Sequence, residues 1–253
     1  MKGTRGGFTL IELLASVAIV GVLASCLAVA GWKVYKDSSL AVSANNIRQL
    51  AAGSASYLAD NNHVFWRYRF TDPDKPPGVT WWFGFEPAAS LTLPEGQRIL
   101  KPEEGPLGGY VPAGFRPDPS FAFTGKAFKP KYRFGYIGIG YNVLLGGGWL
   151  GTGQPLNYWS LNKPGEIVVF ATSAQVNTFQ RPASARNPMI EEFYGLDQRE
   201  ITVHFRHAGL AMVAFANGSA GFLPIDETTR DPRAPKANVG RFAPVGSTQY
   251  LKP

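Results

Sequence analysis

An apolar segment near the N-terminus constrains this sequence more than any other feature. Between Phe8 and Ala30, every residue except Glu12 is apolar, a glycine or a small hydroxyl residue. A helix of this length, at about 1.5 Å per residue, spans a hydrocarbon layer roughly 30 Å thick. An acidic side chain costs about 2.5–3.5 kcal/mol at the centre of a bilayer on insertion scales, and less near the interface. Glu12 is therefore expected to have a partner and a function.

The residues that open the segment, Gly-Phe-Thr-Leu-Ile-Glu from Gly7 to Glu12, carry a family resemblance. They resemble the processing site of type IV pilins and of the pseudopilins of type II secretion. The resemblance implies that prepilin peptidase removes residues 1–7 by cleavage after Gly7, and that the new N-terminus, Phe8, is N-methylated. It also implies that Glu12 pairs with the N-terminal amine of a neighbouring subunit. Such a pair is physically reasonable, because a buried amine and a buried carboxylate each offset the desolvation of the other.

Three other interpretations of the segment remain open. An ordinary single-pass anchor needs neither Gly7-Phe8 nor Glu12. A secretory signal would be cleaved after residues 28–30, whose sequence Ala-Val-Ala provides small residues at the cleavage site. A lipoprotein signal would use Leu-Ala-Ser-Cys, in which Cys26 is the acylated residue. Glu12 argues against both signals, because a charge inside the apolar region of a signal is unfavourable.

Helical periodicity continues beyond the membrane segment, through residues 32–62. Apolar or small residues recur every three or four positions and predict one buried helical face. This face comprises Leu40, Ala44, Ile47, Ala51, Ala55 and Leu58. Asn61-Asn62 provides a helix stop, since asparagine tolerates left-handed geometry. One helix over residues 8–60 would be about 80 Å long, with residues 8–31 in the membrane or filament core. The alternative is two helices that break near Gly31.

Residues 63–253 predict a β-rich globular domain with long loops. Aromatic residues make up 13% of the chain, which favours strands, and charged residues make up only 17%. Strands are expected over residues 64–70, 79–85, 132–145 and 166–171, and a short helix is expected over residues 95–100. Cys26 is the only cysteine, so this domain cannot form an internal disulfide. The fold class is therefore α+β, with a long N-terminal helix packed on an antiparallel β-rich domain.

The C-terminal part predicts an antiparallel meander over residues 201–223, followed by an extended polar tail over residues 224–253. Asn217-Gly218 is a strong hairpin signal, because both residues tolerate positive φ. His207, nine further residues and then Asn217-Gly218 resemble the His-x9-Asp-Gly motif of large bacterial pilin-like proteins, with asparagine in place of aspartate. We expect these three residues to form structural turns, since His207 and Asn217 would lie about 20 Å apart at opposite ends of one strand.

The sequence offers no basis for an enzyme, a cofactor or a metal site. His204 and His207 point to opposite faces of the predicted strand and would not share zinc. The acidic pairs Asp72/Asp74, Glu103/Glu104 and Glu191/Glu192 lack the oxygen spacing of a calcium loop and predict solvated loops. The net charge of +7 falls to +5 without Lys2 and Arg5. Basic residues are scattered, so nucleic acid is not an expected partner.

These patterns predict a pilin-like structural subunit of a type IV pilus-like filament or a type II secretion pseudopilus. Expected partners are prepilin peptidase, other pilin or pseudopilin subunits and the membrane. The expected location is the bacterial inner membrane, crossed once, with the globular domain on the periplasmic side. The alternative is a membrane-anchored or lipid-anchored extracytoplasmic protein that binds carbohydrate on an aromatic platform. The platform residues would be Trp66, Trp81, Trp82, Trp149, Tyr158 and Trp159, and two or more exposed coplanar indoles would support it.

Overall fold

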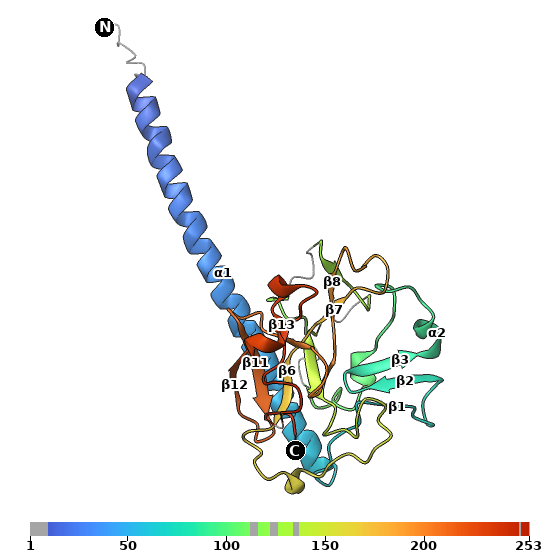
Figure 1. Ribbon diagram of the computed structural model, residues 1–253. Helices are drawn as coiled ribbons and strands as arrows, with labels where there is room; N and C mark the ends of the chain where they lie inside the picture. Colours follow the sequence, from blue (N-terminus) through green and yellow to red (C-terminus); the bar gives the residue numbers. More distant parts are fainter. Residues whose placement is uncertain (1–9, 112–115, 122–125, 134–136, 248, 253) are drawn as a thin grey trace, which may run out of the picture.

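The computed structural model describes residues 10–111, 116–121, 126–133, 137–247 and 249–252, with the backbone alone described for residues 28–37. One long helix projects from a β-rich globular domain, and the domain packs against one face of the C-terminal half of that helix (Figure 1). The predicted α+β class is confirmed. Antiparallel pairing dominates the sheets, and long loops join the strands.

Helix α1 (Leu10–Asp60) is continuous and contains 51 residues, which corresponds to a length of about 77 Å. The expected single helix is confirmed, and the alternative break near Gly31 is wrong. The helix ends where predicted, because Asn62 and His63 adopt left-handed φ values of 53° and 59°. The N–H of His63 donates to the carbonyl of Leu58 at 2.8 Å, which satisfies one carbonyl of the last turn.

The buried face of α1 differs in part from the predicted face. Ile47, Ala51 and Leu58 are buried, while Leu40 and Ala55 are exposed. The buried positions that the pattern did not include are Ser39, Ser43, Asn46, Leu50, Gly53 and Ser54. Most are small or polar, and their serine hydroxyls donate to carbonyls one turn earlier or to the domain. Apolar spacing alone therefore placed the centre of this face incorrectly.

The central sheet has five strands in the order β12-β11-β6-β5-β9. They are β5 (Ile139–Asn142), β6 (Val168–Thr172), β9 (Gly195–Leu196), β11 (Leu210–Phe215) and β12 (Ala220–Pro224). All pairs are antiparallel except β5 with β9. Helix α1 packs against β11, β12 and β6, so this sheet holds the helix in place.

Both faces of β6 and β11 in the central sheet are covered, which explains why these two strands are apolar without alternation, while the edge strand β12 is only partly buried. On β11, Met212 and Ala214 belong to the main core with α1, while Ala211 and Val213 face a second cluster. The C-terminal residues complete this second cluster, and Leu251 is only 5% exposed within it.

The tail over residues 224–253 is therefore not the extended surface segment expected from its polarity. It contains two 3-10 turns, η3 (Glu227–Thr229) and η4 (Pro235–Ala237), and the short strand β13 (Val239–Gly240). Phe242 and Leu251 bury their apolar side chains, although the tail as a whole is polar in composition.

The expected meander over residues 201–223 is correct only for its last two strands. Strand β10 (Val203–His204) pairs with β13 and not with β11. The edge of β11 opposite β12 is occupied by β6. Strand β6 is buried at every position, so its backbone groups need partners on both sides. The turn at Ala208-Gly209 still forms, and both residues have positive φ.

The aromatic segments before the central sheet also differ from the prediction. Residues 79–85 form a hairpin, with β2 (Gly78–Trp81) and β3 (Gly84–Pro87) joined by a turn. Within residues 64–70, only β1 (Arg69–Phe70) is a strand. Helices occur at α2 (Ala88–Leu91) and η1 (Pro102–Glu104), and residues 95–100 are not helical. Aromatic content identified buried segments here but not their turns.

The remaining elements are a second three-stranded sheet and a 3-10 turn. Strands β4 (Phe128–Lys129), β7 (Gln175–Asn177) and β8 (Met189–Glu191) form a sheet in the order β4-β8-β7. The 3-10 turn η2 (Tyr158–Ser160) lies near the C-terminal end of α1, because the N–H of Tyr158 donates to the carbonyl of His63 at 2.7 Å.

Candidate membrane-spanning segment and apolar pocket

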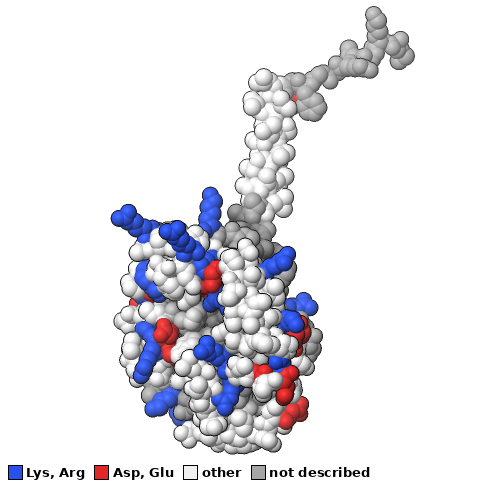
Figure 2. Space-filling model, turned by 90° about the vertical axis from the view of Figure 1, so that its right-hand side faces the viewer, with Lys and Arg blue, Asp and Glu red and all other residues white. Residues whose placement is uncertain are grey.

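The N-terminal half of α1 is apolar on every side and lies outside the globular domain. Residues Leu10–Leu27 have a mean hydropathy of 2.4, and none of them is buried. Figure 2 shows the described part of this projection as a nearly uncharged surface, with basic and acidic side chains gathered on the domain. A helix that is hydrophobic all round belongs in a membrane or among other apolar helices. This segment is long enough for a single membrane span.

Glu12 is the only ionisable residue within Leu10–Leu27 apart from Cys26, and it lies in the first turn of α1. The partial positive charge at a helix N-terminus favours a carboxylate at this position. The processing residues Gly7 and Phe8 lie outside the described residues. Cys26 is an exposed thiol further along the same helix. The structure thus places the carboxylate at the end of the segment nearest the predicted cleavage site.

The serine hydroxyl groups of this segment form hydrogen bonds with carbonyl groups of the same helix. Ser16 donates to the carbonyl of Leu13 at 2.8 Å, and Ser25 donates to the carbonyl of Val22 at 2.7 Å. Bonds of this kind allow serine to face an apolar medium without an unpaired polar group.

A buried polar cluster that sequence reasoning missed fastens α1 to the domain. Asp118 accepts hydrogen bonds from the hydroxyl of Ser43 on α1 and from the guanidinium of Arg206, with Nε at 3.0 Å. Ser120 contributes its N–H at 2.9 Å. Burial acts to raise the pKa of Asp118, but Arg206 and these hydrogen bonds outweigh it and hold the pKa well below its usual range. No local spacing relates Asp118 to Arg206, so the sequence carries no simple signal for this pair.

His207 and Asn217 lie at opposite ends of β11 and belong to separate turns. The backbone of His207 exchanges hydrogen bonds with Leu210 at 3.0 and 3.1 Å. The side chain of Asn217 accepts from the N–H of Ser219 at 3.0 Å. Only Gly218 has positive φ, at 85°, and its N–H donates to Phe215 at 2.9 Å. The hairpin loop is therefore the three-residue type with a left-handed glycine.

The side chain of His207 has a lowered pKa and a buried nitrogen atom without a partner among the described residues. The Nε2 atom of His207 is buried and has no hydrogen-bond partner among the described residues. Burial, followed by the nearby guanidinium of Arg206, lowers the pKa of His207 to about 4. Burial also holds the pKa of His204 well below its usual range. Both rings are therefore neutral at physiological pH.

One acidic pair proves to be interior and not a solvated loop. Glu191 and Glu192 are both completely buried. Glu191 accepts from Asn177 at 2.6 Å and pairs with Lys129 at 3.4 Å. Glu192 accepts from the hydroxyl of Tyr194 and from the N–H of Lys131 at 3.2 Å. Burial raises the pKa of Glu192 to about 7, although these hydrogen bonds oppose the change.

Metal-ligating side chains do not gather in the part of the chain that the structure describes. No group of three or more His, Cys, Asp or Glu side chains there could hold a metal ion. The two other acidic pairs lie at least partly in solvent, since Asp74 and Glu103 are exposed.

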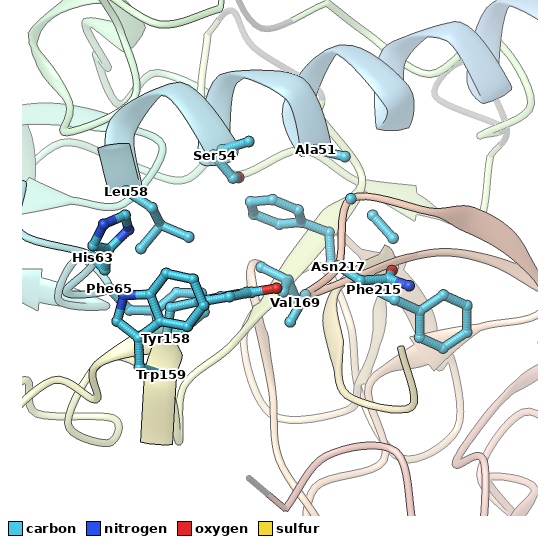
Figure 3. A pocket seen from close by; sticks show the side chains of 15 residues that line it. Ala51, Ser54, Leu58, His63, Phe65, Tyr158, Trp159, Val169, Phe215 and Asn217 are labelled. Atoms are coloured by element: carbon cyan, nitrogen blue, oxygen red, sulfur yellow. The ribbon is translucent and has the colours of Figure 1, made fainter. Parts of the chain in front are cut away.

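An apolar pocket of about 210 Å³ lies at the C-terminal end of α1. Figure 3 shows Ala51, Ser54 and Leu58 of the helix along one wall, with the rings of His63, Phe65, Tyr158 and Trp159 at one end. Phe215 and Asn217 lie at the other end. The rings of His63 and Trp159 make an edge contact, with centroids 5.1 Å apart.

The aromatic platform of the alternative interpretation is not formed by the described residues. Trp66 is 2% exposed and Trp82 is fully buried, and both stack among other core rings. Trp81 and Trp149 are half-buried, and Trp159 is the one indole of this set that is largely exposed, at 70%. The set therefore offers no pair of exposed indoles, and the carbohydrate-platform alternative loses its structural support.

Comparison with known proteins gives one match, at the N-terminus. Residues 3–25 match the family described as the prokaryotic N-terminal methylation motif. Comparisons with curated proteins and with solved structures give no match. The C-terminal residues His207, Asn217 and Gly218 lie outside the matched range. The matched range contains Glu12 and most of the apolar span. The chain thus carries a prepilin-type methylation motif at the start of an exposed apolar helix, which supports its resemblance to type IV pilin-like proteins.

Proposed function

We propose that this protein is a structural subunit of a type IV pilus-like filament or a type II secretion pseudopilus. Prepilin peptidase cleaves it after Gly7, and Phe8 becomes the methylated N-terminus. The segment Leu10–Leu27 anchors the subunit in the bacterial inner membrane until it joins other subunits. The observation that carries this proposal is an apolar helix, exposed on all sides, that begins within a prepilin-type methylation motif.

The exposed half of α1 suits both environments of such a subunit. In the bilayer its side chains contact lipid, and in a filament they contact equivalent helices from other copies. Apolar burial changes little between these two environments, because lipid tails are as apolar as leucine. Polar interactions therefore decide how helices associate. Glu12 supplies the carboxylate for a pair with the N-terminal amine at Phe8 of a neighbouring subunit, which would set the register between copies.

The globular domain is held on the other half of the same helix. Asp118 and the core around Ile47 tie α1 to the central sheet. One continuous helix therefore connects the N-terminal segment to the domain, so the place of that segment in a filament fixes the place of the domain. We assign to the domain, on the periplasmic side, the contacts that distinguish partners or cargo.

The first test is intact-mass and N-terminal peptide analysis of the protein purified from the membranes of its host. A mature chain that starts at methylated Phe8 supports the proposal. A chain that starts at lipidated Cys26 or at Gly31 lacks Glu12 and overturns it.

The second test addresses Glu12 directly. Glu12→Gln keeps the size of the side chain but removes its charge. We expect the variant to enter the membrane normally, while the yield of sheared filaments falls roughly tenfold, the change expected for a loss of about 1.4 kcal/mol per contact. Ser16→Ala on the same exposed helix is the control and should assemble normally. Normal assembly of Glu12→Gln would refute the role of the carboxylate.

A further inference from the structure

The pocket at the end of α1 has the size and lining of a receptor for one aromatic ring. Its volume is about 210 Å³, and a cavity of about 150 Å³ lined by apolar side chains is known to hold benzene. Small residues of α1, Ala51 and Ala55, leave space on one wall, and Phe65 and Phe215 supply apolar surface on others. A phenyl group fits within this volume.

The surroundings of the pocket indicate that the ring is part of a polypeptide. Trp159 lines the pocket and is 70% exposed. A small molecule inside the pocket would leave most of this indole in water, whereas a flanking backbone would cover it. Exposed tryptophans beside a pocket are typical centres of protein contacts.

The helix end beside the pocket carries a partial negative charge. The last turn of α1 contains no basic residue, and its exposed acidic residue, Asp60, lies outside the pocket lining. The C-terminus of a helix also carries a partial negative charge of about half an electron. A segment that docks here should therefore combine an aromatic ring with basic neighbours.

The domain itself presents such a segment. Phe179 follows β7 and is 69% exposed, which is the largest exposure of any phenylalanine among the described residues. Its neighbours Arg181 and Arg186 are exposed, and residues 178–188 contain no acidic residue. The loop therefore has the charge that complements the C-terminal end of α1.

The exposed ring is held outward by buried structure. The Oδ1 atom of Asn177 accepts from the N–H groups of Phe179 at 3.1 Å and Gln180 at 3.0 Å. Asn177 is itself fully buried and donates to Glu191 at 2.6 Å. Such preorganisation lowers the entropy that a protruding side chain loses on binding.

The pocket and the β7 loop lie at opposite ends of the domain. Figure 1 shows β7 and β8 toward the end from which the N-terminal half of α1 leaves, while the pocket lies beside the C-terminal end of the helix. We infer that Phe179 of one copy of this chain occupies the pocket of the next copy. The contact is head-to-tail and leaves one pocket and one ring unused at the ends, so it can continue along a filament. This inference rests on the proposed function.

The test measures self-association of the full chain in detergent by analytical ultracentrifugation. Phe179→Ala removes the ring, and Ala55→Leu fills the pocket from an exposed helix position. Each should raise the dissociation constant at least about tenfold, as expected for truncation of a central aromatic contact. The double variant should be no weaker than the weaker single variant, because both changes remove one contact.

Two matched controls accompany these variants. Ala52→Leu makes the same substitution at an exposed position of α1 that does not line the pocket. Leu150→Ala removes another exposed apolar side chain of the domain. Both should associate like the wild type. All four sites are exposed, so circular dichroism should show an intact fold in each variant.

The outcomes separate this contact from the filament function. The contact is overturned if neither Phe179→Ala nor Ala55→Leu raises the dissociation constant. It is also overturned if the wild-type chain remains monomeric. Normal processing at Phe8 would then still support the filament proposal. Conversely, association that depends on both residues supports the contact even where the mature chain does not begin at Phe8.

Discussion

Arg206 binds Asp118 in the interior, with Nε donating to Oδ2 at 3.0 Å and with only 3% and 2% of the two side chains exposed. The same guanidinium donates to the carbonyl of Gly138 at 2.7 Å. Because Asp118 also accepts from Ser43, one carboxylate links helix α1 to residues on two other parts of the domain. The joint between helix α1 and the domain is thus polar, buried and hydrogen-bonded.

Removing the carboxylate should be costly. Asp118→Ala leaves Arg206 buried without its counter-ion, and we expect the free energy of unfolding to fall by about 3–5 kcal/mol. Urea unfolding of the full chain in detergent measures this change. Asp118→Ala combined with Arg206→Met should lose less than the sum of the two single variants, since no charge is then left unpaired. Strict additivity would contradict the pairing.

Ser43, which contributes to this joint from helix α1, predicts a smaller effect on the free energy of unfolding. Ser43→Ala removes one buried hydrogen bond to Asp118 and should lower the free energy of unfolding by about 1 kcal/mol. Ser38 is exposed on the same helix, so Ser38→Ala is the matched control and should change stability by less than about 0.5 kcal/mol. Equal effects at both positions would show that Ser43 reports helix propensity alone.

Glu192 predicts a loss of stability as the pH rises. Its pKa in the folded protein is about 7, above the ordinary value of 4.5, because burial disfavours the charged form. The folded state therefore holds the proton more tightly than the unfolded state. The stabilisation is complete below pH 4.5 and is lost as the pH rises through 7, with a maximum of about 3 kcal/mol.

Glu192→Gln should flatten this part of the pH dependence, because the amide does not titrate. The measurement is the free energy of unfolding at several pH values from 4.5 to 8. Glu103→Gln, at an exposed position, serves as the control and should retain the wild-type slope.

The lowered pKa of His207 predicts that the free energy of unfolding rises with pH, which is opposite to the dependence predicted for Glu192. Burial lowers its pKa to about 4 from the ordinary value of 6.5, so the unfolded state binds the proton more tightly. The contribution of the neutral ring is complete above pH 6.5 and is lost as the pH falls toward 4. His207→Gln should therefore reduce the rise in stability between pH 4 and 6.5, and His204, whose pKa is also lowered, should account for the remainder. In the wild type this rise and the fall due to Glu192 oppose each other, so Glu192→Gln should enlarge the net rise and His207→Gln should enlarge the net fall.

Gly53 predicts a steric effect on α1. A Cβ atom at this position would lie 2.8 Å from the carbonyl oxygen of Tyr110 and 3.0 Å from a methyl group of Val111. Alanine is the better helix former by about 1 kcal/mol, but the contact with rigid backbone should dominate. We expect Gly53→Ala to destabilise the chain by about 1–3 kcal/mol. Ser56→Ala, on the exposed face, should be neutral or slightly stabilising.

The parts of the fold that the sequence predicted correctly depend on local patterns. The continuous helix follows from apolar content and periodicity, its end follows from Asn61-Asn62, and the β11–β12 hairpin follows from Asn217-Gly218. Each of these signals is confined to a few neighbouring residues. The fold class follows from the same signals, because a long helix before a strand-rich segment allows few other arrangements.

The parts that the sequence could not predict depend on partners far along the chain. The burial of Glu191 requires Lys129 and Asn177, and the bond between Asp118 and Arg206 joins residues with no common motif. The pairing of β10 with β13 is decided by which strand occupies the edge of β11. The pocket also needs α1, η2 and the hairpin together, so no single segment predicts it.

The packing of α1 against the central sheet has a consequence for biosynthesis. Ile47 belongs to the same core cluster as Met212 of β11, so about 165 residues of sequence separate them. At about 5–20 residues per second, the ribosome needs roughly 8–33 seconds to add the strand after the helix face has been made. During that time the apolar face of the helix lacks its partners on β11. Insertion of the N-terminal half into the membrane during synthesis would hold the helix at a fixed place while the rest of its core is made.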